Sequence, residues 1–366
     1  MIAAAIRAAA PLALAAALAT LTPYAASAQN AAPPAEPKPP AAHHKARPIT
    51  KPAAAQPAAT QPAPAPNTPA PSSPGTSTPA PDTHATAGPE PDLAYGAYQR
   101  GFYLTAFAFA TKRVEEKNDP KSMTLLGELY AQGLGVAQDD KKAAEWYALA
   151  AARGDREAMF ALAMFRIAGR GGVADRGEGA KLLASSAKLG KAAAAYNLGL
   201  LYLEGQTFPQ DLNRAAQLFR EAADEGNPEA QYALATFYKE GRGVPKDPVE
   251  AAKLLQAAAI ANNLDAEVEY AIALFNGTGV AKDEAAAVQL LSKAAHQGSP
   301  IAANRLSRVL MFGIGAPLDR VEGAKWHLIA KANGDGDLAL DTEVEKLSPE
   351  DRAKAEAAAK HWLNGK

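Results

Sequence analysis

The chain has 366 residues, of which 48% are hydrophobic and 21% are charged, and its formal net charge is -1. This charge balance excludes a strongly basic protein that binds nucleic acid through bulk charge. The chain contains no cysteine, so its fold must be held by packing without disulfides.

The first 28 residues combine one early positive charge, an apolar run and a cleavage signal. Arg7 precedes the Ala/Leu-rich stretch 8–21, and the small residues 26–28 follow it. This order predicts a secretory signal peptide over 1–28. The alternative is a short anchor that stays attached, but the apolar run is shorter than the roughly 20 residues of a spanning helix. We therefore expect export to the periplasm, with secretion as the alternative, and no stable membrane insertion after cleavage.

Residues 29–91 have a different composition from the rest of the chain. They hold 18 of the 28 prolines, mixed with Ala, Thr and Ser. Such a stretch cannot bury a hydrophobic core, because Ile49 is its only large apolar residue. We predict a disordered Pro/Ala-rich linker over 29–91.

From residue 119 onward the sequence repeats itself every 36 residues. A glycine or asparagine closes each unit, at Gly154, Gly190, Gly226, Asn262, Gly298 and Gly334. An aspartate recurs inside each unit, at Asp139, Asp175, Asp211, Asp247, Asp283 and Asp319. Self-similarity at such a period is the signature of a repeat array. We predict six repeats, over 119–154, 155–190, 191–226, 227–262, 263–298 and 299–334.

Each repeat is predicted to form a helix, a glycine loop and a second helix. A residue that caps helix N-termini opens the first helix in five repeats, with Lys191 as the exception in the third. A glycine is expected to end that helix in a left-handed conformation, at Gly133, Gly169, Gly205, Gly241, Gly277 and Gly313. The aspartate column then caps the second helix. We favour this role over a ladder of metal-binding carboxylates, because each Asp lies one whole repeat from the next.

Shorter helical segments flank the six repeats. Residues 92–118 contain Tyr98-Gln-Arg-Gly101, which matches Tyr130-Ala-Gln-Gly133 of the first repeat, and are predicted to form a partial repeat that caps the array. Residues 335–366 are predicted to form C-terminal capping helices, because Ser348-Pro349 is a strong helix start. Caps at both ends disfavour end-to-end filaments, and we expect a monomer.

The repeat resembles a known family. The stretch Leu126-Gly-Glu-Leu-Tyr-Ala-Gln-Gly-Leu-Gly-Val136, then Asp139, then Lys142-Ala-Ala-Glu-Trp-Tyr-Ala-Leu-Ala-Ala151, is similar to the Sel1-like repeat (SLR), a relative of the tetratricopeptide repeat. The resemblance implies an all-α fold, a right-handed superhelical solenoid of antiparallel helix pairs. It also implies a role as an adaptor or regulator that binds other proteins. A cysteine-rich branch of the family is associated with penicillin binding, but this chain lacks those cysteines.

An apolar stripe on the first helices is the candidate binding surface. On a helical wheel, positions six, ten and thirteen of the repeat lie nearly opposite the core stripe, where polar residues are expected. The sequence instead places apolar residues there: Phe160, Met164, Tyr196, Leu200, Tyr232, Ile272, Phe275 and Met311. Two explanations stay open, a groove that binds a protein partner and burial against neighbouring first helices.

The search for chemistry yields no catalytic residue, metal site or cofactor. Ser185 and Lys188 have the Ser-x-x-Lys spacing of penicillin-recognising enzymes, but no Ser-Asp-Asn or Lys-Thr-Gly partner exists. The histidines of the repeat region and C-terminus, His296, His327 and His361, are too scattered for a metal cluster. The glycine pairs end helices, whereas nucleotide-binding loops begin them.

The expected function is therefore a non-enzymatic scaffold or regulator of the cell envelope that binds another protein, and no nucleic acid, along the solenoid. One alternative is binding or hydrolysis of a beta-lactam or peptidoglycan fragment, as in the cysteine-rich branch. A second alternative is a passive envelope spacer.

Overall fold

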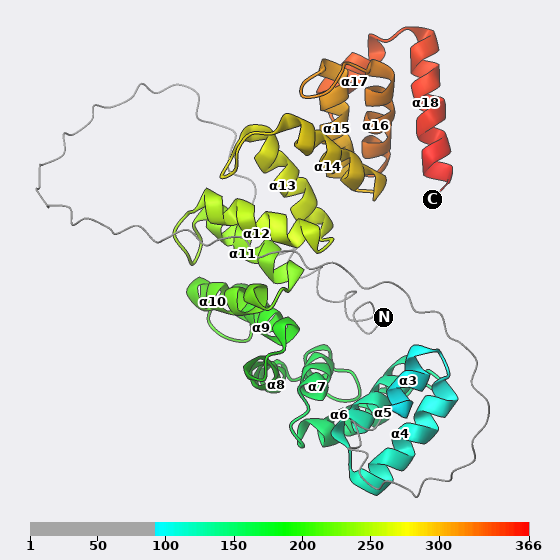
Figure 1. The fold of residues 1–366 in the computed structure, drawn as a ribbon, viewed down its shortest axis with the longest axis vertical. Helices are drawn as coiled ribbons and strands as arrows, with labels where there is room; N and C mark the ends of the chain where they lie inside the picture. The colour runs from blue at the N-terminus through cyan, green and yellow to red at the C-terminus, as the bar shows by residue number, and fades with distance from the viewer. Residues whose placement is uncertain (1–91, 366) are drawn as a thin grey trace, which may run out of the picture. The chain divides into compact units, whose positions relative to one another are not determined.

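The computed structural model describes residues 92–365, and the predicted signal peptide and linker (1–28 and 29–91) lie outside this range. Within it the chain forms sixteen helices and no strand (Figure 1). None of these helices combines the length and the apolar character needed to cross a membrane. The all-helical prediction is confirmed for this part of the chain.

The six repeats each form an antiparallel pair of helices. The first helices are α5 (Pro120–Gln132), α7 (Arg156–Ala168), α9 (Ala192–Glu204), α11 (Pro228–Glu240), α13 (Leu264–Asn276) and α15 (Pro300–Phe312). The second helices are α6 (Asp140–Ala151), α8 (Arg176–Lys188), α10 (Leu212–Asp224), α12 (Pro248–Ile260), α14 (Glu284–His296) and α16 (Arg320–Ala332).

Side-chain caps begin these helices at the predicted columns. Each member of the aspartate column accepts a hydrogen bond from a backbone N–H in the first turn of the second helix, as Asp139 does from Lys142. Five first helices have the same kind of cap, and α9 after Lys191 has none. Such a cap contributes roughly 1 kcal/mol of helix stability. The capping role of the aspartates is confirmed.

Two loop glycines are required for different reasons. Gly133 and its equivalents end the first helices with φ between 67° and 73°, a left-handed conformation that favours a residue without a side chain. Gly279, two residues after such a glycine, lies against the N-terminus of the preceding repeat's second helix. A Cβ on Gly279 would stand 1.8 Å from the carbonyl oxygen of Pro248. The second glycine therefore lets one repeat approach the backbone of the repeat before it.

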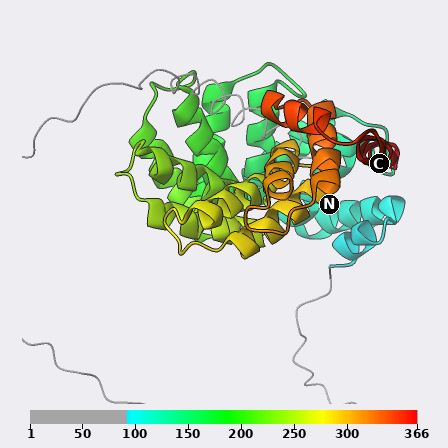
Figure 2. The same ribbon diagram turned by 90° about the horizontal axis from the view of Figure 1, so that it is seen from above.

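Each helix of the array packs against its neighbours in sequence. Figure 2 looks along the vertical axis of Figure 1, and consecutive pairs are rotated relative to one another, as in a superhelical solenoid. Small residues on the first helices admit aromatic rings from the second: a Cβ on Gly127 would lie 2.6 Å from the Tyr147 ring, and one on Gly199 would lie 2.7 Å from Phe219. The core is therefore a series of linked clusters between helix pairs.

Additional helices close the two ends. At the N-terminal end α3 (Leu93–Gln99) and α4 (Tyr103–Lys117) pack against α5. At the C-terminal end α17 (Leu338–Glu345) is followed by α18 (Pro349–Asn364), which packs along α16. The Ser348 hydroxyl caps α18 by accepting from the Asp351 N–H at 3.1 Å.

Candidate protein-binding surface

The structure divides the predicted apolar stripe into two groups of four. Phe160, Tyr196, Leu200 and Met311 are buried in the core. Met164, Tyr232, Ile272 and Phe275 are half-buried and pack against the edges of core clusters. Of the two explanations that the sequence leaves open, burial against neighbouring helices is the correct one for the first group.

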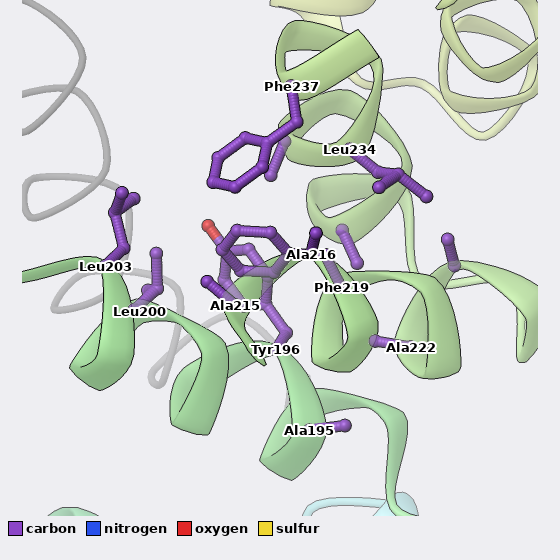
Figure 3. Close-up of a cluster of buried hydrophobic side chains, with 13 residues drawn as sticks. Ala195, Tyr196, Leu200, Leu203, Ala215, Ala216, Phe219, Ala222, Leu234 and Phe237 are labelled. Atoms are coloured by element: carbon purple, nitrogen blue, oxygen red, sulfur yellow. The ribbon is translucent and has the colours of Figure 1, made fainter. Parts of the chain in front are cut away.

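Tyr196 shows why a helical wheel misplaces these residues. Its ring lies 5.7 Å from that of Phe219 on α10, and Phe219 in turn lies 5.4 Å from Phe237 on α11. Figure 3 shows these rings together, with Leu200 beside them on α9. A wheel assumes one buried side, but a helix inside a solenoid has neighbours on several sides. Tyr196 is therefore buried against Phe219 of the second helix in its own repeat, and Phe219 links it to the next repeat.

Phe160 and Met311 are buried by similar contacts between helices. Phe160 belongs to a cluster with Leu183 of α8 and Leu198 of α9, and the Lys191 ammonium lies 5.5 Å from its ring centre. Met311 packs between α16 and α17, in a cluster with Leu340. Both side chains pack between consecutive helices, so they stabilise the fold independently of any binding partner.

The half-buried residues leave apolar surface open on α7, α11 and α13. Tyr232 is the most informative, because carboxylates surround it. Burial, followed by the negative charges of Glu269, Asp265 and Glu240, raises the pKa of the Tyr232 phenol well above its ordinary value. Burial and the neighbouring Glu269 also raise the pKa of the Asp265 carboxyl. An aromatic ring in this negative setting is suited to a cationic side chain.

Two cations already lie in this acidic region. The Arg242 guanidinium is 3.5 Å from a carboxylate oxygen of Glu240. The Lys239 ammonium is 2.9 Å from a carboxylate oxygen of Glu269. Asp265 and Glu240 contribute further negative charge around Tyr232. This surface, Tyr232 with Glu240, Asp265 and Glu269, is called the Tyr232 surface below. Sequence reasoning identified the tyrosine but not the carboxylates, which come together only when α11 and α13 pack.

The Ser-x-x-Lys motif lies on an ordinary helical turn of α8. The Ser185 hydroxyl is exposed and donates a hydrogen bond to the Lys181 carbonyl at 3.0 Å. Its neighbour Ser186 is fully buried and donates to the Arg156 carbonyl at 2.7 Å. A nucleophilic serine needs a base that takes its proton, and here the Ser185 proton is directed at a backbone carbonyl.

Within residues 92–365 no three His, Asp or Glu side chains are grouped so that they could hold a metal ion. His327 is instead a buried structural residue. Its Nε2 lies 2.8 Å from a carboxylate oxygen of Asp341, which also accepts a hydrogen bond from Lys331. Hydrogen bonds from His327 and Lys331 hold the pKa of the Asp341 carboxyl below its ordinary value. This network ties α16 to α17.

Comparison with known proteins identifies the repeats. The family model described as Sel1 repeat matches residues 120–155, 156–191, 192–227, 228–263, 264–299 and 300–335. These are the six predicted units, displaced by one residue. A search of curated proteins finds no match.

Two solved structures share the fold. A Sel1 repeat protein from Oxalobacter formigenes is 26% identical, with a TM-score of 0.56, and the match covers 66% of this chain and 97% of that one. A protective antigen of uropathogenic Escherichia coli, described as displaying an SLR fold, is also 26% identical, with a TM-score of 0.51. That match covers 74% of this chain and 67% of the antigen. A helical solenoid of this kind is therefore shared with both proteins.

Proposed function

Because the chain belongs to the Sel1 repeat family, we propose that it is a scaffold of the cell envelope that binds another protein through the first-helix face of its solenoid. Proteins of this family are generally scaffolds for protein interactions. A stack of helix pairs provides an extended surface and distributes binding over several repeats. The envelope location is supported by the sequence of residues 1–28, which has the order of a secretory signal peptide.

The Tyr232 surface is the observation that carries this proposal. It offers a half-buried aromatic ring among three carboxylates, and Ile272 and Phe275 lie on the neighbouring α13. An extended or helical segment with a Lys or Arg beside apolar residues matches this arrangement, because the cation meets the carboxylates while the apolar side chains cover α13. Such a segment in another envelope protein is the proposed ligand.

Photo-cross-linking in intact cells tests the surface. A photoreactive amino acid is placed at Ile272 on the proposed surface and, as a matched control, at the strongly exposed Lys181 on α8. We expect one reproducible cross-linked protein from Ile272 and none from Lys181. Recovery of no protein from Ile272, or of the same proteins from both sites, contradicts the proposal.

Charge reversal then tests the chemistry of the ligand. Asp265→Lys should reduce the yield of the cross-linked product at least about tenfold, because a cation would then face the partner's cation. Glu356→Lys, on the exposed face of α18, is the control and should leave the yield unchanged. Equal yields from the wild type and Asp265→Lys would show that the carboxylates do not select the partner.

A further inference from the structure

Exposed hydrophobic side chains are concentrated at the N-terminal end of the array. Of the sixteen large hydrophobic residues exposed within 92–365, five lie between residues 93 and 109. We call this set the N-terminal apolar face: Leu93, Tyr95, Phe102, Leu104 and Phe109. Contiguous apolar surface of this kind marks interaction sites in soluble proteins.

The face lies on the outer side of α3 and α4. The inner side contains Ala94, Ala97, Ala106 and Ala110, which are buried in a cluster with Leu126 and Leu129 of α5. The partly buried Tyr98, Tyr103, Phe107 and Val114 pack against the same cluster. On α4 the exposed residues recur at helical spacing, at Leu104, Thr105, Ala108, Phe109, Lys112, Glu115 and Glu116. Small side chains at Thr105 and Ala108 leave room for another helix to approach closely.

The repeat alignment shows what normally covers this side. Tyr98 to Gly101 match Tyr130 to Gly133, so Leu93 occupies the position of Leu125 in the first repeat. Leu125 is 8% exposed and belongs to the cluster formed with α3 and α4, whereas Leu93 is 55% exposed. The difference arises because a helix pair precedes Leu125 and none of the described residues covers Leu93. A helix pair of the same kind therefore fits the N-terminal apolar face.

We propose that, in place of such a preceding pair, the same face of a second copy of the chain covers this side, so that two arrays join through α3 and α4 in a symmetric dimer. A two-fold interface brings the same face of both copies together, so each exposed side chain of the face is buried in both copies. The charged residues on or beside this face include Arg100, which lies over the Phe102 ring at 5.9 Å, Lys112, whose ammonium is 3.8 Å from a Glu116 carboxylate oxygen, and the exposed Glu115.

The available area is sufficient for a reversible dimer. A large aromatic side chain can bury about 150–250 Å², so five large side chains about half exposed offer on the order of 500 Å² per copy. Two copies would then bury about 1,000 Å² in total, at the lower limit of specific interfaces. A dissociation constant in the micromolar range is expected. Dimerisation would place two Tyr232 surfaces in one particle. The dimer does not depend on partner binding at the Tyr232 surface, so either proposal can fail without the other.

The oligomeric state of the full chain tests the proposal. Sedimentation velocity from about 1 to about 300 μM should show the average mass rising from that of one 37.9 kDa chain toward twice that value. Leu104→Glu should raise the dissociation constant at least about tenfold. The control is Leu338→Glu on α17, because Leu338 is 84% exposed and Leu104 is 71% exposed. Neither substitution disturbs the core, and circular dichroism checks that both variants fold.

A single introduced cysteine supplies a second measurement, because the natural chain has none. Ala108→Cys should give a covalent dimer with a bifunctional maleimide, and Leu338→Cys should not. A wild-type chain that stays monomeric over the whole range overturns the proposal. It is also overturned if Leu104→Glu and Leu338→Glu weaken association equally. Protection of the Ala108→Cys thiol from maleimide in a monomer would show that residues of the same chain cover the face, which contradicts a dimer.

Discussion

The two ends of the helical array carry opposite kinds of outer surface. At the C-terminal end α18 turns Ala355 and Ala359 inward and exposes mostly charged residues and alanines. Trp362 of this helix packs edge-on against the buried Trp326 of α16, with ring centres 5.8 Å apart. At the N-terminal end the fully buried residues of α3 and α4 are alanines, and Tyr98, Tyr103 and Phe107 pack against them, but Leu93, Tyr95, Leu104 and Phe109 are exposed.

This difference shows that an end of a solenoid can have its core covered by an extra helix without that helix having a polar outer surface. Both ends bury the last core face of the repeats, because each supplies an extra helix that packs on it. The outer side of α18 carries mostly charged residues and alanines, whereas α3 and α4 expose more of their large apolar side chains. The expectation of a monomer rested on caps at both ends, and the structure has an extra helix at each end.

The largest predicted effect concerns the aromatic anchor of the C-terminal end. Trp326→Ala should lower the free energy of unfolding by about 3–5 kcal/mol, because Trp326 is 1% exposed and leaves a large cavity. Urea denaturation followed by circular dichroism measures the change. Leu338→Ala, at an exposed site of the same end, should change it by less than about 0.5 kcal/mol. A loss below about 1 kcal/mol for Trp326→Ala would show that the aromatic contact does not hold this end.

A pair of loop glycines compares the backbone contacts near the two ends. Gly135 and Gly315 both have positive φ, so alanine costs about 1–2 kcal/mol at either site. At Gly135 the new Cβ would also lie 2.9 Å from two backbone atoms, one of Tyr103 and one of Leu104, whereas at Gly315 it would have one contact this short, at 2.9 Å from the Glu284 Cβ. Gly135→Ala should therefore lower the thermal midpoint more than Gly315→Ala does. The reverse order would contradict the close approach of this loop to α4.

Helix caps give a smaller effect at each end. Ser348→Ala should destabilise α18 by about 1 kcal/mol, because the Asp351 N–H loses its acceptor. Asp92→Ala removes the corresponding acceptor of the Tyr95 N–H on α3 and should cost a similar amount. Hydrogen exchange should show faster exchange confined to α18 in the first variant and to α3 in the second. Faster exchange throughout the chain would mean that the ends do not open separately.

The smallest effect is a pH dependence at the C-terminal end. Hydrogen bonds from His327 and Lys331 lower the pKa of the Asp341 carboxyl in the folded chain. The carboxylate therefore stabilises the fold fully above its unfolded pKa, near 3.9. This stabilisation is lost as the pH falls through the lower folded pKa. Asp341→Asn should therefore unfold at lower urea than the wild type at pH 7, and the difference should shrink below about pH 4. If the difference in urea midpoint between the two proteins does not change with pH, the effect comes from side-chain packing and not from the charge of Asp341.

The glycine and aspartate columns show what could be predicted from the sequence. Their roles depend on local geometry. The glycine ends the first helix in a left-handed conformation, and the aspartate caps the second helix a few residues later in the chain. Asp139 and Gly133 therefore behave in the structure as the sequence predicts.

The candidate surface could be predicted only in part, because it depends on neighbouring helices. Tyr196 and Tyr232 occupy the same repeat position, yet the first is buried by Phe219 and the second stays half-buried beside carboxylates. Leu93 and Leu125 likewise share a position and differ in what precedes them. Residue type and spacing are the same within each pair, so the sequence pattern alone could not separate their members.

The contact made by Gly279 has a consequence for synthesis on the ribosome. This loop glycine rests on Pro248, Gly243 rests on Leu212, and Gly135 rests on Tyr103 and Leu104, so the supporting surface always comes earlier in the chain. A repeat that leaves the ribosome therefore meets a support that has already been made, and no loop has to wait for residues still untranslated. The array can thus fold vectorially during translation, one unit behind the growing end.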